Sequence, residues 1–81
     1  MNAAEAQIQD IRFLDDEVGL EKLPKNLREI AEVRVNNPET SLSGLGELLD
    51  PPIGKSGVNG RLRKLSELAR KLRSGEETGL R

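Results

Sequence analysis

The side chains between residues 55 and 73 have the chemistry of a nucleic-acid-binding surface. Seven lysines and arginines stand there against a single acid, Glu67, so this basic segment carries a net charge of +6. Lysine and arginine neutralise phosphates, arginine can donate two hydrogen bonds to a guanine edge, and asparagine can pair with an adenine edge. If the segment is a helix, Asn59 and Arg63 lie on one face. These residue types favour double-stranded DNA as the partner.

Other kinds of chemistry lack the residues they need. The chain has no histidine and no cysteine, which excludes Ser-His and Cys-His nucleophile pairs, disulfides, and metal sites built from imidazole or thiolate. Glu67 stands alone in the basic segment, so no cluster of acids there resembles the metal site of a nuclease. We therefore expect neither an enzyme nor a cofactor-binding protein.

Helical periodicity divides the basic segment into two faces. At about 100° per residue, four apolar side chains fall within about 40° of Val58, and Leu68 flanks them. These four are Leu62, Leu65, Ala69 and Leu72. The stripe is predicted to be buried. The opposite face is predicted to be exposed and carries Ser56, Asn59, Gly60, Arg63, Lys64, Glu67, Arg70 and Lys71.

Position along the helix then separates two kinds of predicted DNA contact. The basic segment is expected to be the second helix of a helix-turn-helix, whose first helix precedes it in the chain. When such a motif docks on DNA, the first turns of its second helix meet base edges, while residues further along meet the phosphate backbone. The predicted base contacts are Asn59, Arg63 and Gly60, the last by bringing the helix backbone close to DNA. The predicted phosphate contacts are Lys55, Ser56, Arg61, Lys64 and Arg70.

Three of these residues also have structural interpretations. Arg61 lies nearer the core and could pair with an acid instead of DNA. Asn59 could be a surface or capping side chain, and Gly60 could mark a loosely wound first turn.

The elements that must position this surface are four helices, with no strand expected, so the fold class is an all-α bundle. The first helix is predicted from Ala3, after an Asn2-to-Glu5 capping pattern, to just before Gly19. The second begins near Pro24 and stops at 36–38. The predicted bounds of the last two are from Thr40 or Ser41 to about Leu49, and from Lys55 or Ser56 to about Arg73.

The last two helices form a predicted helix-turn-helix. Their buried sides are Leu42, Leu45 and Leu49, and then Val58, Leu62 and Leu65. Gly46 falls where the two helices should cross closely, and residues 50–52, Asp-Pro-Pro, block a continuous helix. Counted from Gly46, Val58 comes about two residues later than in the commonest form of the motif, so the turn should re-aim the second helix.

Charge is segregated along the chain although its net value is only −1. Residues 1–24 hold six acids against two bases, a net of −4. Opposed fields favour an oriented partner, with a polyanion at the basic end and a different partner at the acidic end. No apolar run approaches the roughly 20 residues that span a bilayer, and no signal-peptide pattern opens the chain. We expect a cytoplasmic protein with no membrane partner.

Residues 23–73 resemble the C-terminal helix-turn-helix domain of the WhiA family of bacterial transcription regulators, and the resemblance extends upstream over residues 3–24. Its most specific part is ELLDPPIGKSGVNGRLRKL, residues 47–65, where a double-proline turn precedes Lys-Ser-Gly-Val-Asn. The resemblance implies a DNA-binding domain similar to region 4 of sigma factors. In the family, this domain is joined to a larger N-terminal domain similar to LAGLIDADG homing endonucleases. We therefore expect a C-terminal piece, with Met1 as an added start.

The resemblance also implies a target and partners. It implies binding to a GACAC-type promoter element in the control of sporulation and cell division, together with a WhiB-type iron–sulfur regulator and RNA polymerase, at the nucleoid. The residues it places at or near DNA are Lys55, Ser56, Asn59, Arg61 and Arg63. The family pattern has Ser or Thr at position 54 and His at position 60, where this chain has glycine at both. The change at 60 removes an exposed side chain and so bears on target preference.

Three units are expected along the chain: an acidic helix over 1–22, a helix-turn-helix domain over 23–73, and a flexible tail over 74–81. One alternative function stays open, namely a protein-interaction module that docks its basic helix on RNA polymerase or a partner regulator. A single module of this size covers only about 600 to 1,000 Å² of protein surface on DNA, so we expect help from another domain or partner.

Overall fold

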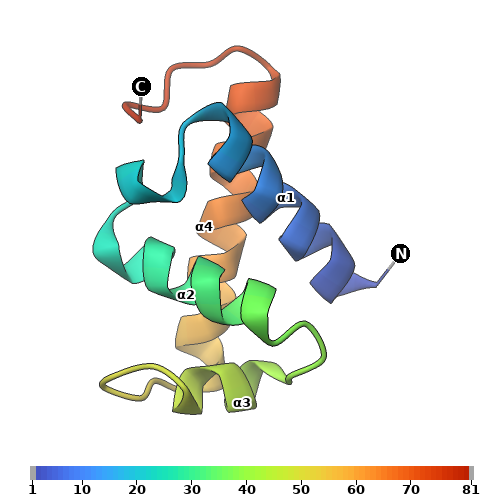
Figure 1. Ribbon diagram of the computed structural model, residues 1–81, viewed down its shortest axis with the longest axis vertical. Coiled ribbons are helices and arrows are strands. Elements are labelled where there is room, and N and C mark those ends of the chain that lie inside the picture. Colours follow the sequence, from blue (N-terminus) through green and yellow to red (C-terminus); the bar gives the residue numbers. More distant parts are fainter. Residues whose placement is uncertain (1, 81) are drawn as a thin grey trace.

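The structure is a computed structural model that describes residues 2–80. Over these residues the chain forms four α-helices, one short 3₁₀-helix and no strand, which confirms the predicted all-α bundle. The elements are α1 (Ala3–Glu17), η1 (Leu20–Lys22), α2 (Lys25–Asn36), α3 (Leu42–Glu47) and α4 (Lys55–Arg73). Figure 1 shows α4 running most of the height of the molecule, α1 and α2 packed against it, and α3 at its N-terminal end.

Local capping sets the bounds of α1 close to those predicted. The Asn2 side chain accepts a 2.8 Å hydrogen bond from the backbone N–H of Glu5, which satisfies one of the free donors in the first turn. After the helix, Gly19 adopts a φ of +86°, a conformation that favours glycine. The short η1 then follows, which the sequence pattern did not predict. Leu23, directly after it, is buried and fixes this turn to the core.

The helix-turn-helix bounds are also near the predicted ones. Ser41 rather than Thr40 caps α3, because its Oγ accepts a hydrogen bond from the Gly44 N–H at 3.1 Å. The helix ends at Glu47, a little before the predicted Leu49. The next helix, α4, begins at Lys55, the earlier of the two predicted starts.

The hydrophobic core lies where the other helices meet α4. The predicted stripe of α4 is confirmed, since its buried residues are Val58, Leu62, Leu65, Leu68, Ala69 and Leu72. The other elements contribute Ile11, Leu14, Leu23, Leu27, Ile30, Ala31, Leu45 and Leu49. The prediction for Leu42 is wrong in degree, because this residue packs against the core but is only half-buried. It lies in the first turn of a helix of only 6 residues, so little structure covers it.

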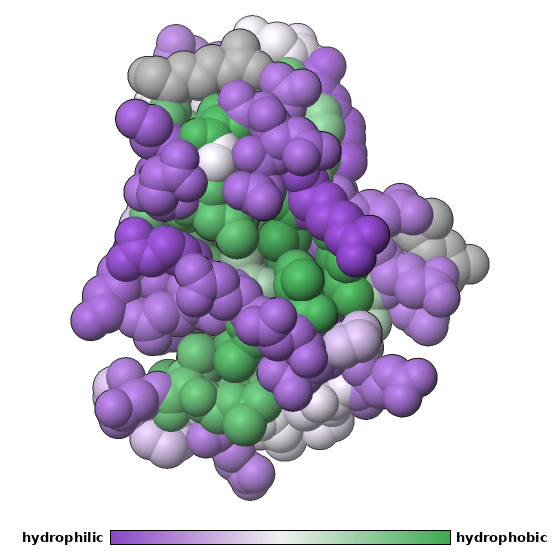
Figure 2. Space-filling model, viewed as in Figure 1, coloured by the Kyte–Doolittle hydropathy of each residue, from purple (hydrophilic) through white to green (hydrophobic). Residues whose placement is uncertain are grey.

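Polar side chains cover most of the visible surface. On the face shown in Figure 2, apolar residues come to the surface between them, including a group toward the foot of the molecule, where α3 and the turn after it lie. Leu48, the residue that follows α3, is 54% exposed. Among the described residues, no helix combines the length and the apolar composition needed to cross a membrane.

Candidate nucleic-acid interface

The exposed face of α4 carries the predicted contact residues. Those that are exposed are Lys55, Ser56, Asn59, Gly60, Arg63, Lys64 and Arg70. Arg61 alone among the eight is half-buried, as its position near the core flank predicts. One helix face thus presents an amide, a hydroxyl and several cations to solvent, while the opposite stripe fixes that face to the core.

The turn between α3 and α4 is held against α3 at Gly46. The Ile53 N–H donates a 3.1 Å hydrogen bond to the Gly46 carbonyl oxygen. A Cβ atom at Gly46 would overlap the Ile53 carbonyl oxygen and lie 3.2 Å from Cγ2 of Val58. The predicted close approach at Gly46 is confirmed, but the nearest neighbour is the turn's own backbone rather than the second helix. Because any side chain would push this turn away, Gly46 helps to fix where α4 begins.

Arg34 fixes the other end of the motif, and sequence reasoning missed it. This side chain is only 3% exposed, and its Nη1 donates to three backbone carbonyls, those of Asn37, Pro38 and Thr40, at 3.3, 3.1 and 3.0 Å. Burial lowers the pKa of Arg34 below its ordinary value. The contacts clamp the end of α2 to the segment that enters α3. Helical spacing could have predicted this burial, because Arg34 lies on the same face of α2 as the buried Leu27, Ile30 and Ala31.

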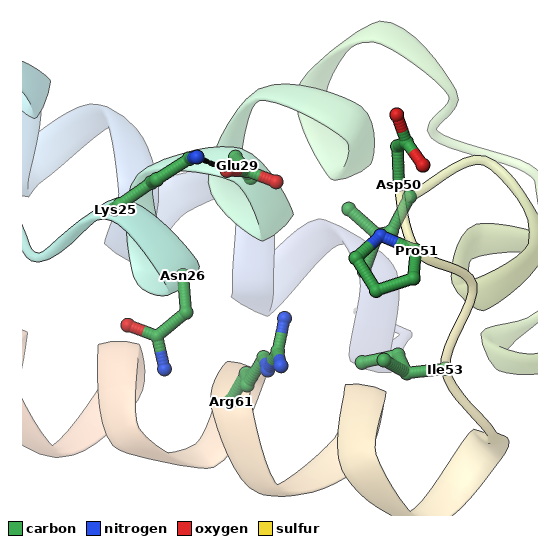
Figure 3. Close-up of a pocket in the computed structure, with 8 residues that line it drawn as sticks. Lys25, Asn26, Glu29, Asp50, Pro51, Ile53 and Arg61 are labelled. Atoms are coloured by element: carbon green, nitrogen blue, oxygen red, sulfur yellow. Dashed lines mark ion pairs between the residues drawn. The ribbon is translucent and has the colours of Figure 1, made fainter.

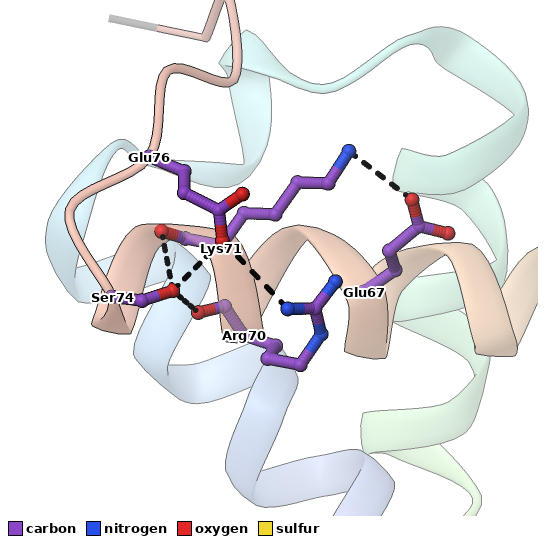
Figure 4. A network of polar contacts seen from close by, with 5 residues as sticks. All are labelled: Glu67, Arg70, Lys71, Ser74 and Glu76. Atoms are coloured by element: carbon purple, nitrogen blue, oxygen red, sulfur yellow. Dashed lines mark hydrogen bonds and ion pairs between the residues drawn. The ribbon is translucent and has the colours of Figure 1, made fainter.

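Acids neutralise the C-terminal half of the basic segment. Glu67 lies 3.2 Å from Lys71 and 3.9 Å from Lys64, and Figure 4 shows Glu67 and Lys71 reaching toward each other. The hydrogen bond from Lys71, followed by the charge of Lys64, lowers the pKa of Glu67. Glu76, in the segment after α4, lies 3.7 Å from the guanidinium of Arg70.

The last arginine of the helix is tied to α1. Arg73 donates a 2.7 Å hydrogen bond to Asp10, and its guanidinium lies 4.4 Å from the ring centroid of Phe13. The acidic first helix is therefore fixed beside the C-terminal end of α4.

In the N-terminal half of the basic segment, most cations have no acid beside them within residues 2–80. Within residues 2–80, no carboxylate lies within 4.0 Å of Lys55, Arg61 or Arg63. The alternative that Arg61 pairs with an acid thus finds no support in this part of the chain. Cations free of acids concentrate at the end of α4 that a helix-turn-helix presents to the major groove.

The glycines of α4 have different surroundings. A Cβ atom at Gly57 would lie 3.2 Å from Cδ1 of Ile53, so the turn leaves little room there. At Gly60 no atom of residues 2–80 lies within 4 Å of such a Cβ. Packing therefore gives a reason for glycine at position 57 and none at position 60.

Comparison with known proteins identifies the family. Residues 1–69 match the family model described as the WhiA C-terminal HTH domain. A probable cell division protein WhiA from Desulforamulus reducens is 60% identical over 77 residues, which cover 95% of this chain and 24% of that protein. The corresponding protein from Clostridium perfringens is 56% identical over 75 residues, which cover 93% of this chain and 24% of that protein.

A solved structure agrees with these sequence matches. The crystal structure of full-length DUF199/WhiA from Thermatoga maritima aligns with a TM-score of 0.79 and 35% identity, covering 84% of this chain and 23% of that one. The present chain therefore spans about a quarter of the length of the relatives it matches. It belongs to the WhiA family, and its helix-turn-helix is that family's C-terminal HTH domain.

Proposed function

We propose that this domain binds double-stranded DNA sequence-specifically, with the first turns of α4 in the major groove, as the promoter-reading part of a bacterial transcription regulator. The observation that carries the proposal is the acid-free start of α4. Lys55, Arg61 and Arg63 have no carboxylate partner within residues 2–80, and they lie in the same first half of α4 as the exposed Asn59. Family membership supports the same conclusion.

Roles on this surface follow from side-chain chemistry. Asn59 and Arg63 project from neighbouring turns and pair with base edges, while Gly60 brings the helix backbone close to the DNA. The phosphate contacts are Lys55, Ser56, Arg61, Lys64 and Arg70, which set register and salt dependence. Arg70 must exchange its pairing with Glu76 for a phosphate. Exposed ion pairs contribute only about 0–1 kcal/mol, so this exchange is feasible.

The family resemblance extends the proposal to a biological setting. The relatives' names describe probable cell division proteins. A GACAC-type promoter element, a WhiB-type iron–sulfur regulator and RNA polymerase are the partners we propose for the whole regulator, in cell division and sporulation control. Binding to chromosomal DNA would place it at the nucleoid in the cytoplasm. The domain acts by binding rather than by catalysis.

Substitutions on the two halves of α4 test the DNA-reading role. On a site selected from random duplex DNA, we expect Arg63→Ala to lower the ratio of specific to random affinity by about 5- to 150-fold, the equivalent of 1–3 kcal/mol per base pair read. Lys71→Ala, which also removes one positive charge, should weaken binding to both DNAs alike. Fluorescence anisotropy over a range of salt concentrations measures both quantities.

Two results would contradict the proposal. If Arg63→Ala and Lys71→Ala lowered the ratio of specific to random DNA affinity equally, Arg63 would not be a base-contacting residue. Affinity for DNA that does not fall as salt rises, beside tight binding to a protein partner, would favour the protein-interaction alternative.

A further inference from the structure

A groove separates the start of α2 from the first half of α4. It has a volume of about 480 Å³ and is lined by Pro24, Asn26, Leu27, Gly57, Gly60, Arg61 and Lys64. At about 100° per residue, Gly57, Gly60 and Lys64 lie on the side of the exposed α4 face away from Asn59 and Arg63. The exposed face of α4 thus has two sides, one toward this α2–α4 groove and one bearing the predicted base-reading residues.

A second hollow adjoins the groove but differs from it in charge. It has a volume of about 280 Å³, shares Asn26 and Arg61 with the groove, and is also lined by Glu29 and Asp50. Figure 3 shows Asn26 extending from α2 toward α4, and Arg61 extending from α4 toward α2. The second hollow therefore contains both charge signs. In the α2–α4 groove, Arg61 and Lys64 are the charged lining residues and both are positive.

Gly60 keeps the groove open without a packing reason. A Cβ atom there would meet no atom of the described residues within 4 Å, so alanine would fit the fold. Glycine inside a helix destabilises it by about 0.5–1 kcal/mol relative to alanine. A glycine retained at such a cost is suited to the close approach of another backbone.

We propose that the α2–α4 groove holds the sugar–phosphate backbone of one DNA strand. In this arrangement the bare surface at Gly60 admits the strand. Asn26 of α2 and Lys64 of α4 donate hydrogen bonds to its phosphates from opposite walls. The inference rests on the proposed DNA-binding function and deepens it, because α2 joins the interface and Gly60 faces the DNA backbone rather than a base.

Matched substitutions at the two ends of α2 test the groove. Asn26→Asp places a negative charge in the groove, and we expect it to weaken binding to specific and random DNA alike by about tenfold through repulsion of the phosphates. The control is Asn36→Asp, which adds the same charge at the exposed far end of α2 and should change affinity by less than about twofold. A carboxylate is favourable at a helix N-terminus, so a loss of folding cannot explain weaker binding by Asn26→Asp.

Two further variants give independent readouts on the intact chain. Gly60→Leu fills the floor of the groove with a good helix former, so the melting temperature should hold or rise while DNA affinity falls at least about tenfold. Lys64→Gln should lower the salt slope by about one, since it removes one phosphate contact, and Lys71→Gln should lower it less. Both lysines pair with Glu67, which makes them a matched pair.

The outcomes distinguish a failure of the groove inference from a failure of the proposed DNA-binding function. If Asn26→Asp matches Asn36→Asp and Gly60→Leu binds as tightly as the unchanged chain, the groove is empty in the complex and this inference is overturned, while base reading by α4 stands. If the unchanged chain selects no DNA sequence, the proposed function itself fails.

Discussion

Single cations along α4 differ in whether a carboxylate neutralises them. Arg63 has no acid within 4.0 Å in the described part of the chain, whereas Lys71 lies 3.2 Å from Glu67. Attraction for a polyanion is thus concentrated in the first turns of the helix, where base contacts are expected. Arg63→Ala and Lys71→Ala each remove one positive charge, so a difference between their effects on DNA binding reports the position and pairing of the cation rather than the net charge.

The carboxylate of Glu67 reports the local field of these cations. Lys71 by its hydrogen bond, then Lys64 and Arg70 by their charges, lower the pKa of Glu67. We predict that Lys71→Met raises the pKa of Glu67 toward its ordinary value, because the largest cause of the shift is removed. Carbon-detected NMR titration of the Glu67 carboxyl group measures the change, and an unmoved midpoint would contradict it.

The sign of the pH effect follows from the direction of this shift. The folded-state pKa of Glu67 is lowered, so its contribution to stability is fully present above the unfolded-state pKa of the carboxyl group. That contribution is lost as pH falls through the lower folded-state value. In Lys71→Met, less stability should therefore be lost over this acidic range.

Residue-level features were predictable where helical geometry alone determines them. The exposure of Asn59 and Arg63 follows from the 100° periodicity once Val58 is placed in the core. The Glu67–Lys71 pair follows from its i, i+4 spacing. The Arg70–Glu76 pair did not, because it depends on the path of the chain after α4, where Gly75 adopts a φ of +77°.

At the scale of elements, the clamp between α2 and α3 sets the position of the helix-turn-helix. Arg34 supplies it through backbone carbonyls beyond the end of α2. A buried arginine is tolerated there because three carbonyls accept hydrogen bonds from its Nη1 and the negative end of the helix dipole offsets its charge, although its buried Nε has no hydrogen-bond partner within residues 2–80.

Removing that clamp should destabilise the fold. We predict that Arg34→Met lowers the free energy of unfolding by about 2–4 kcal/mol and the melting temperature by about 10 °C or more, since three part-buried hydrogen bonds are lost. Arg28→Met is the matched control, because Arg28 lies on the same helix and is half-buried, and its side chain makes no hydrogen bond or ion pair within residues 2–80. Thermal unfolding by circular dichroism compares them, and equal shifts would rule out the clamp.

The elements themselves were largely predictable from local signals. Apolar spacing, the caps at Asn2 and Ser41, and the proline-rich turn placed the four helices within about two residues. The short η1 was missed because three residues cannot display a helical period. Leu42 was assigned to the buried side by spacing alone, which cannot show how little structure covers the first turn of α3.

At the scale of the whole molecule, the fold gives the segregated charges a spatial order. The Asp10–Arg73 contact fixes α1 beside the last turn of α4, so acids surround the C-terminal end of the basic segment and leave its start free. The sequence shows the segregation but not this pairing, which joins residues far apart in the chain. A polyanion is therefore expected to approach from the N-terminal end of α4.

Selection of bound sequences from a pool of random duplex DNA, with this chain alone, tests sequence-specific recognition most directly. We predict that successive rounds enrich a short shared element, and that the same selection with Arg63→Ala enriches an element with one position relaxed. Retention of DNA in every round, with the recovered sequences still random, would contradict the account, since it would mean that the basic face of α4 attracts phosphates but reads no bases.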